Sequence, residues 1–151
     1  MATATLPQAG YSGRTLPEKL GFKAGMDIAF VALPDALAGL ADAADFASVR
    51  RTRDWGEPLG TPRAFDAIHA FTKRAAEIET GLPALQDAIR RDGMIWVSWP
   101  KKASKVPTDI GEDGLRGILL PTGLVDVKVA AIDATWSGLK FMFRKEIRPT
   151  L

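Results

Sequence analysis

The fold is decided by residues 65–99, which read FDAIHAFTKRAAEIETGLPALQDAIRRDGMIWVSW. An alternating run at 65–71 and an apolar run at 94–99 both predict strands. Residues 73–91 between them predict a helix, because a single helical stripe holds Ala75, Ile78, Leu82, Leu85 and Ile89. This unit therefore predicts two parallel strands joined by a right-handed crossover helix.

The same stretch contains signals for how its helix bends and ends. Gly81 and Pro83 predict a kink or a split within it. Arg90 and Arg91 are expected at its carboxyl end, where positive charge is favoured, and Gly93 is expected to terminate it. The second strand should then begin at residue 94.

The amino-terminal half continues the alternation of helices and strands. Thr15 to Glu18 has the spacing of a capping box, and Gly21 supplies a stop, so a short helix is predicted between them. Residues 26–33 are nearly all apolar, as in a central strand that is covered on both faces. We expect the remaining segments in the order of a helix at 34–41, a weak strand at 46–51 and a loop at 52–63.

The carboxyl-terminal third predicts a helix within 108–120 and then two strands, at 125–132 and 139–144, joined by a hairpin turn at 133–138. Together these elements predict a three-layer, Rossmann-like α/β fold with a mostly parallel sheet and a terminal antiparallel hairpin. The length predicts one domain over 11–151, preceded by a flexible leader over 1–10.

Composition narrows the classes of function. Acidic and basic residues nearly balance, with a formal net charge of +2, which argues against a dedicated nucleic-acid binder. The chain has no cysteine, which removes disulfides and thiolate chemistry and agrees with a reducing compartment. No apolar run approaches the roughly 20 residues of a membrane span, and residues 1–10 lack the pattern of a signal peptide. A soluble cytoplasmic protein is therefore expected.

The residues that usually carry catalysis are scarce. His69 is the only histidine and lies inside a predicted strand, so we expect it to be a packed structural residue. A lone histidine leaves no pair of histidines to hold a metal ion. The sequence also contains neither a nucleophile elbow nor a Gly-x-x-x-x-Gly-Lys phosphate loop. We therefore predict no catalytic residue, metal or cofactor, and favour a protein that is not an enzyme.

Three short motifs stand at the starts of predicted strands, and their order along the chain matches that of a known fold. They read GMDI at 25–28, FDAI at 65–68 and DGMIWV at 92–97. From Gly21 onward the chain resembles the methyltransferase variety of the Rossmann fold, which implies an S-adenosylmethionine cofactor. It departs from that pattern in the loop after the first strand, 32–35, which reads ALPD. That loop has no glycine to bring the backbone close to a ligand, and its proline removes a backbone donor.

Four further runs carry a second resemblance. They read YSG at 11–13, LGFKAG at 20–25, WVSWPKK at 96–102 and TWSGLKF at 135–141. They are similar to an uncharacterised bacterial family known only as a domain of unknown function. That resemblance implies a bacterial protein and carries no activity with it.

Ligands of open parallel sheets bind outside the carboxyl ends of the strands, where the resemblance places loops starting at Pro34, Thr72, Trp99 and Asp133. The candidate binding residues in these loops are Asp35, Thr72, Lys73, Arg74, Trp99, Lys101, Lys102, Asp133, Trp136 and Ser137.

This mixture of cations and indoles suits an anionic, partly planar ligand. Trp99 and Trp136 would stack on a ring, while Lys101, Lys102 or Arg74 neutralises a carboxylate or phosphate. In the alternative interpretation, the tryptophans only cover the core and the lysines are only solvated.

Two functions remain open. The first is a non-catalytic module that uses the carboxyl edge of the sheet to bind a small anionic molecule or a protein partner. The second is a divergent methyltransferase-like enzyme that depends on S-adenosylmethionine and uses Asp35, Asp66 or Asp133 in place of the missing loop chemistry.

Overall fold

The computed structural model describes residues 15–151 of the chain. The leader expected over 1–10 and the motif at 11–13 lie outside these residues. Within them, no helix combines the length and the apolar character needed to cross a bilayer.

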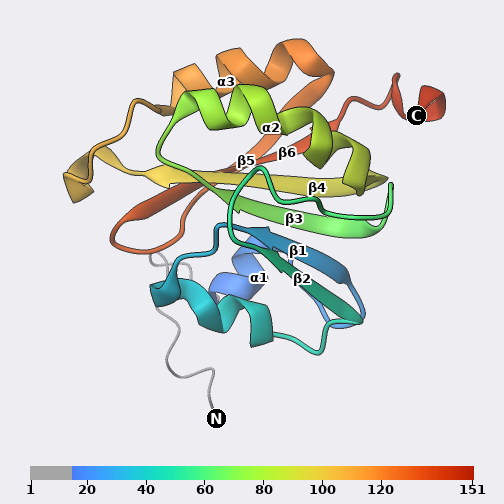
Figure 1. The fold of residues 1–151 in the computed structure, drawn as a ribbon, viewed down its shortest axis with the longest axis horizontal. Coiled ribbons are helices and arrows are strands. Elements are labelled where there is room, and N and C mark those ends of the chain that lie inside the picture. The colour runs from blue at the N-terminus through green and yellow to red at the C-terminus, as the bar shows by residue number, and fades with distance from the viewer. Residues whose placement is uncertain (1–14) are drawn as a thin grey trace.

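One six-stranded sheet forms the centre of the molecule, with the strand order β2-β1-β3-β4-β6-β5 (Figure 1). Strands β1 to β4 are parallel to one another, and β6 lies antiparallel between β4 and β5. The predicted mostly parallel sheet with a terminal antiparallel hairpin is confirmed. The strands are β1 (Asp27–Val31), β2 (Ser48–Thr52), β3 (Phe65–Phe71), β4 (Ile89–Pro100), β5 (Leu124–Ala131) and β6 (Trp136–Phe143).

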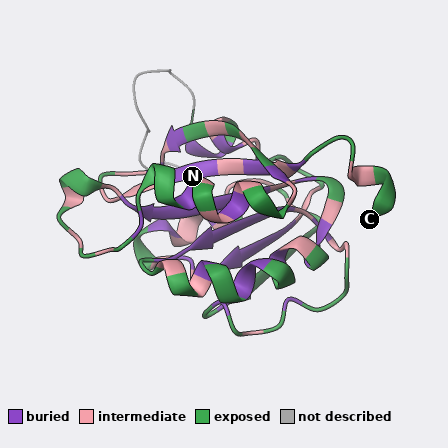
Figure 2. Cartoon of the chain, turned by 90° about the horizontal axis from the view of Figure 1, so that it is seen from above, coloured by how far each residue is buried: buried purple, intermediate pink, exposed green. Residues whose placement is uncertain are grey.

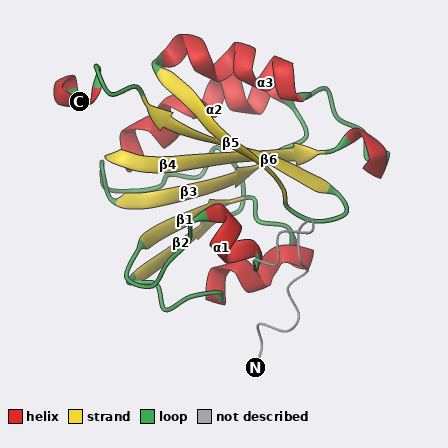
Figure 3. Ribbon diagram, turned by 180° about the vertical axis from the view of Figure 1, so that it is seen from behind, coloured by secondary structure: helices red, strands yellow, loops and turns green. Residues whose placement is uncertain are grey.

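Helices cover both faces of the sheet. One face carries α2 (Ala75–Ala88) and α3 (Glu112–Leu119), and the other carries α1 (Leu16–Leu20) and the 3-10 helix η2 (Asp35–Asp42) (Figures 1 and 3). Seen from above, the helices of the nearer layer carry exposed residues on their outward surfaces, and the strands behind them are largely buried (Figure 2). This is the predicted three-layer arrangement. Three short 3-10 turns complete it: η3 (Lys102–Ser104), η4 (Leu120–Thr122) and η5 (Arg148–Thr150).

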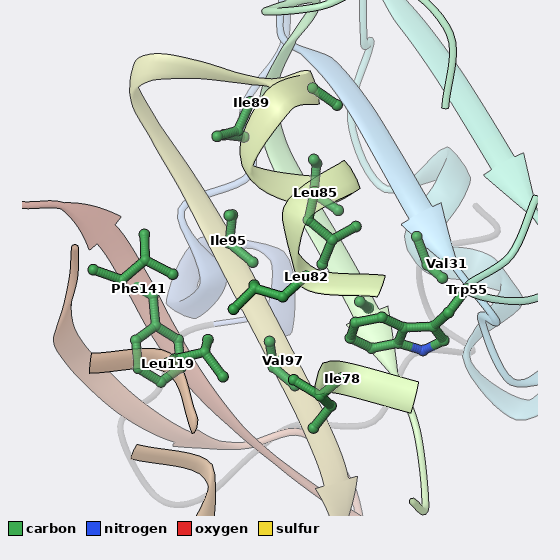
Figure 4. Packing of buried hydrophobic residues seen from close by; sticks show 14 of the residues in the cluster. Val31, Trp55, Ile78, Leu82, Leu85, Ile89, Ile95, Val97, Leu119 and Phe141 are labelled. Carbon is green, nitrogen blue, oxygen red and sulfur yellow. The ribbon is translucent and has the colours of Figure 1, made fainter. Parts of the chain in front are cut away.

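On the face under α2 and α3, the loop after β2 contributes a buried tryptophan, Trp55. Trp55 is 9% exposed, and its Nε1 donates to the Phe71 carbonyl at 2.8 Å. Figure 4 shows its indole among Ile78 and Val31. A Cβ atom added at Gly81 would lie only 2.8 Å from Cε3 of this ring, so the missing side chain at Gly81 lets the indole pack closely against α2. The predicted split at Gly81 and Pro83 is wrong, since α2 runs through both as one helix.

Alanine substitutions in the two helices are expected to have opposite effects. Gly81→Ala should lower the free energy of unfolding by about 1–3 kcal/mol, because the new methyl group displaces Trp55. Gly114→Ala in α3 should raise it by about 0.5–1 kcal/mol, because nothing lies within 4 Å and alanine favours the helix. Urea unfolding of both variants measures the difference. Equal stabilisation by the two substitutions would contradict this packing of Trp55.

The other face encloses His69, which is fully buried as predicted for a structural residue. Its ring stacks on Phe71, with the centroids 4.1 Å apart, and lies near Phe22 and Trp96. Its Nε2 is 2.7 Å from Ser98 Oγ, and its Nδ1 has no partner among residues 15–151. Burial lowers the pKa of His69 from 6.5 to about 3, so the ring is neutral near pH 7.

The segment 90–93 differs from its prediction. Arg90 and Arg91 do not end a helix but lie in β4, which begins at Ile89, and Gly93 does not terminate an element. The β3–β4 register shifts here, so residues 90–93 bulge out of the ladder. Arg90 thereby reaches two carboxylates at the amino edge of the sheet, Asp27 at 2.9 Å and Asp66 at 2.6 Å. These ion pairs favour the strand over the local helix-end signals.

Two smaller differences concern the chain near the sheet edges. The helix expected at 34–41 forms as the 3-10 helix η2. The hairpin turn expected at 133–138 is shorter, because β6 already begins at Trp136.

In the outer strand β5, the pairing with β6 shifts between Asp126 and Lys128, which makes Val127 a bulge.

Candidate functional site

The loops predicted to hold a ligand meet at the carboxyl edge of the sheet. The Lys101 amide donates to the Thr135 carbonyl at 2.7 Å, which joins the loop after β4 to the β5–β6 turn. The Lys73 carbonyl accepts from Thr108 Oγ1 at 2.7 Å and from the Asp109 amide at 3.3 Å. Figure 1 shows η3 and the β5–β6 turn at the same end of the sheet.

The two tryptophans of the predicted site lie on opposite faces of the sheet. In the β4–β6 ladder Trp99 pairs with Ser137, and Trp136 pairs with Pro100. Because side chains alternate along a strand, neighbouring pairs point to opposite faces. Trp99 packs in the core under α2 and α3, whereas Trp136 packs edge-on against Phe71 on the other face. The expectation that both indoles stack on one ring is wrong, and the two indoles line separate hollows at this edge.

The Trp136 hollow lies between the carboxyl ends of β1 and β3 and has a volume of about 340 Å³. Ala32 at its rim has a φ of 56°, a left-handed conformation that is uncommon for alanine. Glu77 in its wall accepts a hydrogen bond from the Thr72 hydroxyl. The hollow is lined by Ala32, Pro34, Phe71, Thr72, Lys73, Arg74, Glu77 and Trp136.

The Trp99 hollow lies between the loop after β4 and the start of α3 and has a volume of about 760 Å³. Its rim is the η3 turn, which is held by hydrogen bonds from Ser104 Oγ to the Lys101 carbonyl at 2.7 Å and from the Lys105 amide to the Lys102 carbonyl at 3.1 Å. The hollow is lined by residues 99–102 and 105–112 together with Ser137.

The acidic side chains near these hollows already have partners. Asp109 accepts from the Ala75 amide at 2.8 Å, at the start of α2. Asp133 accepts from the amides of Thr135 and Trp136 at 2.8 and 2.7 Å, which shapes the β5–β6 turn. Glu112 forms an ion pair with Arg116 at 2.7 Å. Asp35 is exposed at the start of η2 and lines neither hollow.

The cations of the carboxyl edge differ from these acids. Within residues 15–151, none of them forms an ion pair with an acidic group. They are Lys73 and Arg74 at the Trp136 hollow and Lys101, Lys102 and Lys105 at the Trp99 hollow.

The amino edge shows the opposite arrangement. Asp66, which the sequence offered as a substitute catalytic acid, lies there, where it accepts from the Asp27 amide at 2.8 Å and pairs with Arg90. Hydrogen bonds from Ser48 and Arg90 lower the pKa of Asp27. Hydrogen bonds to Asp66 and Asp27 raise the pKa of Arg90. Asp66 therefore cannot act on a ligand bound at the carboxyl edge.

Three features of the edge were missed in the sequence. Lys105 belongs with Lys101 and Lys102, and the short spacing of these lysines was the available signal. Ala32 has a backbone conformation that no local pattern indicates. A third hollow of about 710 Å³ lies beside Trp55 and shares Arg74 and Glu77 with the Trp136 hollow. The binding roles of all the candidate residues stay predictions.

Comparisons with known proteins bear on the fold. No protein-family model matches the sequence, and no curated protein matches it. Among solved structures, the chain is similar to a SAM-dependent methyltransferase from Aquifex aeolicus, with 13% identity, a TM-score of 0.59, and coverage of 85% of this chain and 89% of that one.

Two further structures show the same likeness. The 1,6-didemethyltoxoflavin-N1-methyltransferase of Burkholderia thailandensis, with bound 1,6-didemethyltoxoflavin and S-adenosylhomocysteine, has 13% identity and a TM-score of 0.59, with coverage of 86% of this chain and 75% of that one. A putative type 11 methyltransferase from Sulfolobus solfataricus has 14% identity and a TM-score of 0.56, with coverage of 91% and 95%. At these identities the likeness shows a methyltransferase-like fold and no more.

Proposed function

We propose that this chain is a non-catalytic binding module that holds a small anionic ligand at the carboxyl edge of its sheet. The observation that supports it is the charge difference between the two edges. At the amino edge Arg90 is paired with Asp27 and Asp66, whereas the five carboxyl-edge cations have no such partner within residues 15–151.

The physical argument concerns what these cations would do without a ligand. Lysines and arginines that lie close together repel one another, and nearby carboxylates usually relieve that repulsion. Here Asp109 and Asp133 accept hydrogen bonds from backbone amides and Glu112 pairs with Arg116, and none of the three forms an ion pair with these cations within residues 15–151. A bound anion supplies the missing charge. The acids that line the hollows, Glu77, Asp109 and Glu112, each already accept a hydrogen bond or form an ion pair within residues 15–151, which supports binding without catalysis.

Neutralising the edge is expected to weaken anion binding. The double variant Lys101→Gln, Lys102→Gln should raise the Kd of an anionic ligand by about tenfold, because it removes two charged donors from the Trp99 hollow. Binding is measured by the change in tryptophan fluorescence on titration with AMP, inorganic phosphate or benzoate. Added salt should weaken binding by the wild-type protein.

Arg144→Gln with Lys145→Gln is the matched control, because it also removes two positive charges, from exposed positions after β6 at the amino edge. It should leave the Kd unchanged. Equal weakening by both variants would mean that only net charge matters, which would contradict a site. A wild-type protein that responds to none of the three probes would contradict small-anion binding and redirect the search to protein partners.

Methyl transfer is a second candidate, favoured by the methyltransferase-like fold and by the Trp136 hollow next to the end of β1. Under this alternative, S-adenosylmethionine binds saturably at millimolar concentration, and Trp136→Ala abolishes binding while Trp99→Ala does not. Isothermal titration calorimetry makes the test. The main proposal expects no saturable heat, since Pro34 replaces a backbone donor at this rim.

A further inference from the structure

The Trp99 hollow combines an apolar wall with a cationic rim. Val106, Pro107 and Ile110 form the wall beside Trp99. The indole nitrogen of Trp99 makes no hydrogen bond within residues 15–151, and it is not one of the sealed unpaired atoms of that range, which are Thr52 Oγ1 and His69 Nδ1. Its N–H therefore keeps some exposure and has no partner among the described residues. The volume of about 760 Å³ is that of a site for a small organic molecule.

Lys105 stands out in the rim, because its backbone is strained and its side chain has no structural use. Its φ of 61° is left-handed, a conformation that costs free energy in any residue except glycine. Arg63 has a similar φ of 56°, but its guanidinium donates to the carbonyls of Gln86 and Ile89 near the end of α2. The Lys105 ammonium has no hydrogen bond or ion pair to any residue from 15 to 151. The left-handed backbone lets the Lys105 amide close the η3 turn on the Lys102 carbonyl, so it is the unpaired ammonium that suggests a ligand-holding position.

The number of lysines at the rim of the Trp99 hollow indicates the chemical class of its ligand. Lys101, Lys102 and Lys105 extend from one short turn, so they can surround one group carrying more than a single negative charge. A phosphate monoester carries up to two negative charges near pH 7 and has three acceptor oxygens, and lysine binds it as a point charge. A carboxylate has one charge and needs fewer partners. The wall of proline, isoleucine and indole suits a flat ring.

We infer that the Trp99 hollow binds a flat aromatic ring carrying a phosphate monoester, with the phosphate held by Lys101, Lys102 and Lys105. This inference rests on the proposed anion binding, and it assigns that binding to one of the two hollows and to one class of ligand.

Matched probes test the class of ligand. Phenyl phosphate and AMP carry both parts, phenol and adenosine lack the phosphate, inorganic phosphate lacks the ring, and benzoate replaces phosphate by carboxylate. The complete probes should bind about tenfold more tightly than the partial ones. Their binding should weaken below about pH 6, where phosphate takes up its second proton. Benzoate binding as tightly as phenyl phosphate would overturn the phosphate assignment.

Variants test the position. Lys105→Gln removes the charge and keeps a long side chain, and Lys105→Gly also removes the backbone strain, so both should weaken phenyl phosphate binding about fivefold or more while Lys105→Gly raises the Tm. Lys73→Gln with Arg74→Gln examines the Trp136 hollow, and Lys145→Gln, which removes one charge at an exposed position outside both hollows, should leave binding unchanged.

The outcomes separate this inference from the function on which it rests. If the variants at Lys73 and Arg74 weaken binding and those at Lys105 do not, the ligand lies in the other hollow; the inference fails and anion binding stands. If no probe binds, or if no variant at either hollow changes the Kd, both fail.

Discussion

Acidification from pH 6.5 to pH 3 is expected to remove roughly 4 to 5 kcal/mol of stability through His69 alone. Burial lowers the pKa of this ring to about 3 in the folded chain, whereas the unfolded chain has the ordinary value near 6.5. Between these two values only the unfolded state takes up the proton, so the contribution is complete above pH 6.5 and is lost as the pH falls. Urea unfolding at a series of pH values measures the slope.

The control for this prediction replaces both members of the buried pair. His69→Phe together with Ser98→Ala removes the titrating ring without leaving the Ser98 hydroxyl unpaired in the core. Its stability should vary much less with pH between 3 and 6.5. A double variant with the same slope as the wild type would show that carboxylates, such as Asp27 beside Arg90, account for the acid sensitivity instead.

Trp96→Ala is expected to lower the free energy of unfolding by about 3–5 kcal/mol, since the side chain is fully buried and its loss leaves a large cavity. Trp96 also donates from Nε1 to the Leu20 carbonyl at 3.0 Å, at the end of α1. Helix α1 has five residues, too few to be stable without packing. The substitution should therefore release α1, and hydrogen exchange at the amides of residues 18–20 would report it.

Trp96→Phe separates the hydrogen bond from the packing. Phenylalanine keeps most of the apolar ring but cannot donate to Leu20, so this variant should lose less than half of the stability that the alanine variant loses. If the α1 amides exchange fast in Trp96→Ala but stay protected in Trp96→Phe, then packing of the aromatic ring, and not its hydrogen bond, holds α1 in place. Protection of α1 in both variants would contradict a role for Trp96 in holding it.

The strands, the mostly parallel sheet and the terminal hairpin could be predicted because the apolar runs are continuous and lie between clear turn signals. The segment 90–93 could not, because Arg-Arg-Asp-Gly resembles a helix end locally, whereas the deciding contacts join Arg90 to Asp27 and Asp66, far away in the chain. The loops of the candidate site were also correctly grouped. The faces of Trp99 and Trp136 were not, since one residue of register decides the side of the sheet.

Lys105 shows another limit of sequence reasoning. A lysine between a serine and a valine carries no sign of a left-handed backbone, and that conformation follows from how the η3 turn closes. The distinction between Lys105 and the other surface lysines is thus a property of the folded chain. The same holds for Gly81, whose use depends on Trp55 arriving from a distant loop.

The bulge at Val127 has a consequence for how molecules of this protein meet in a concentrated solution. An outer strand with exposed apolar side chains is a ready template for a strand from another molecule, and Val125, Val127 and Val129 are 40%, 51% and 51% exposed. The extra residue moves the outward-facing amide and carbonyl groups out of step halfway along β5. An incoming regular strand could match only one half of that edge, which makes sheet-to-sheet aggregation through β5 unfavourable.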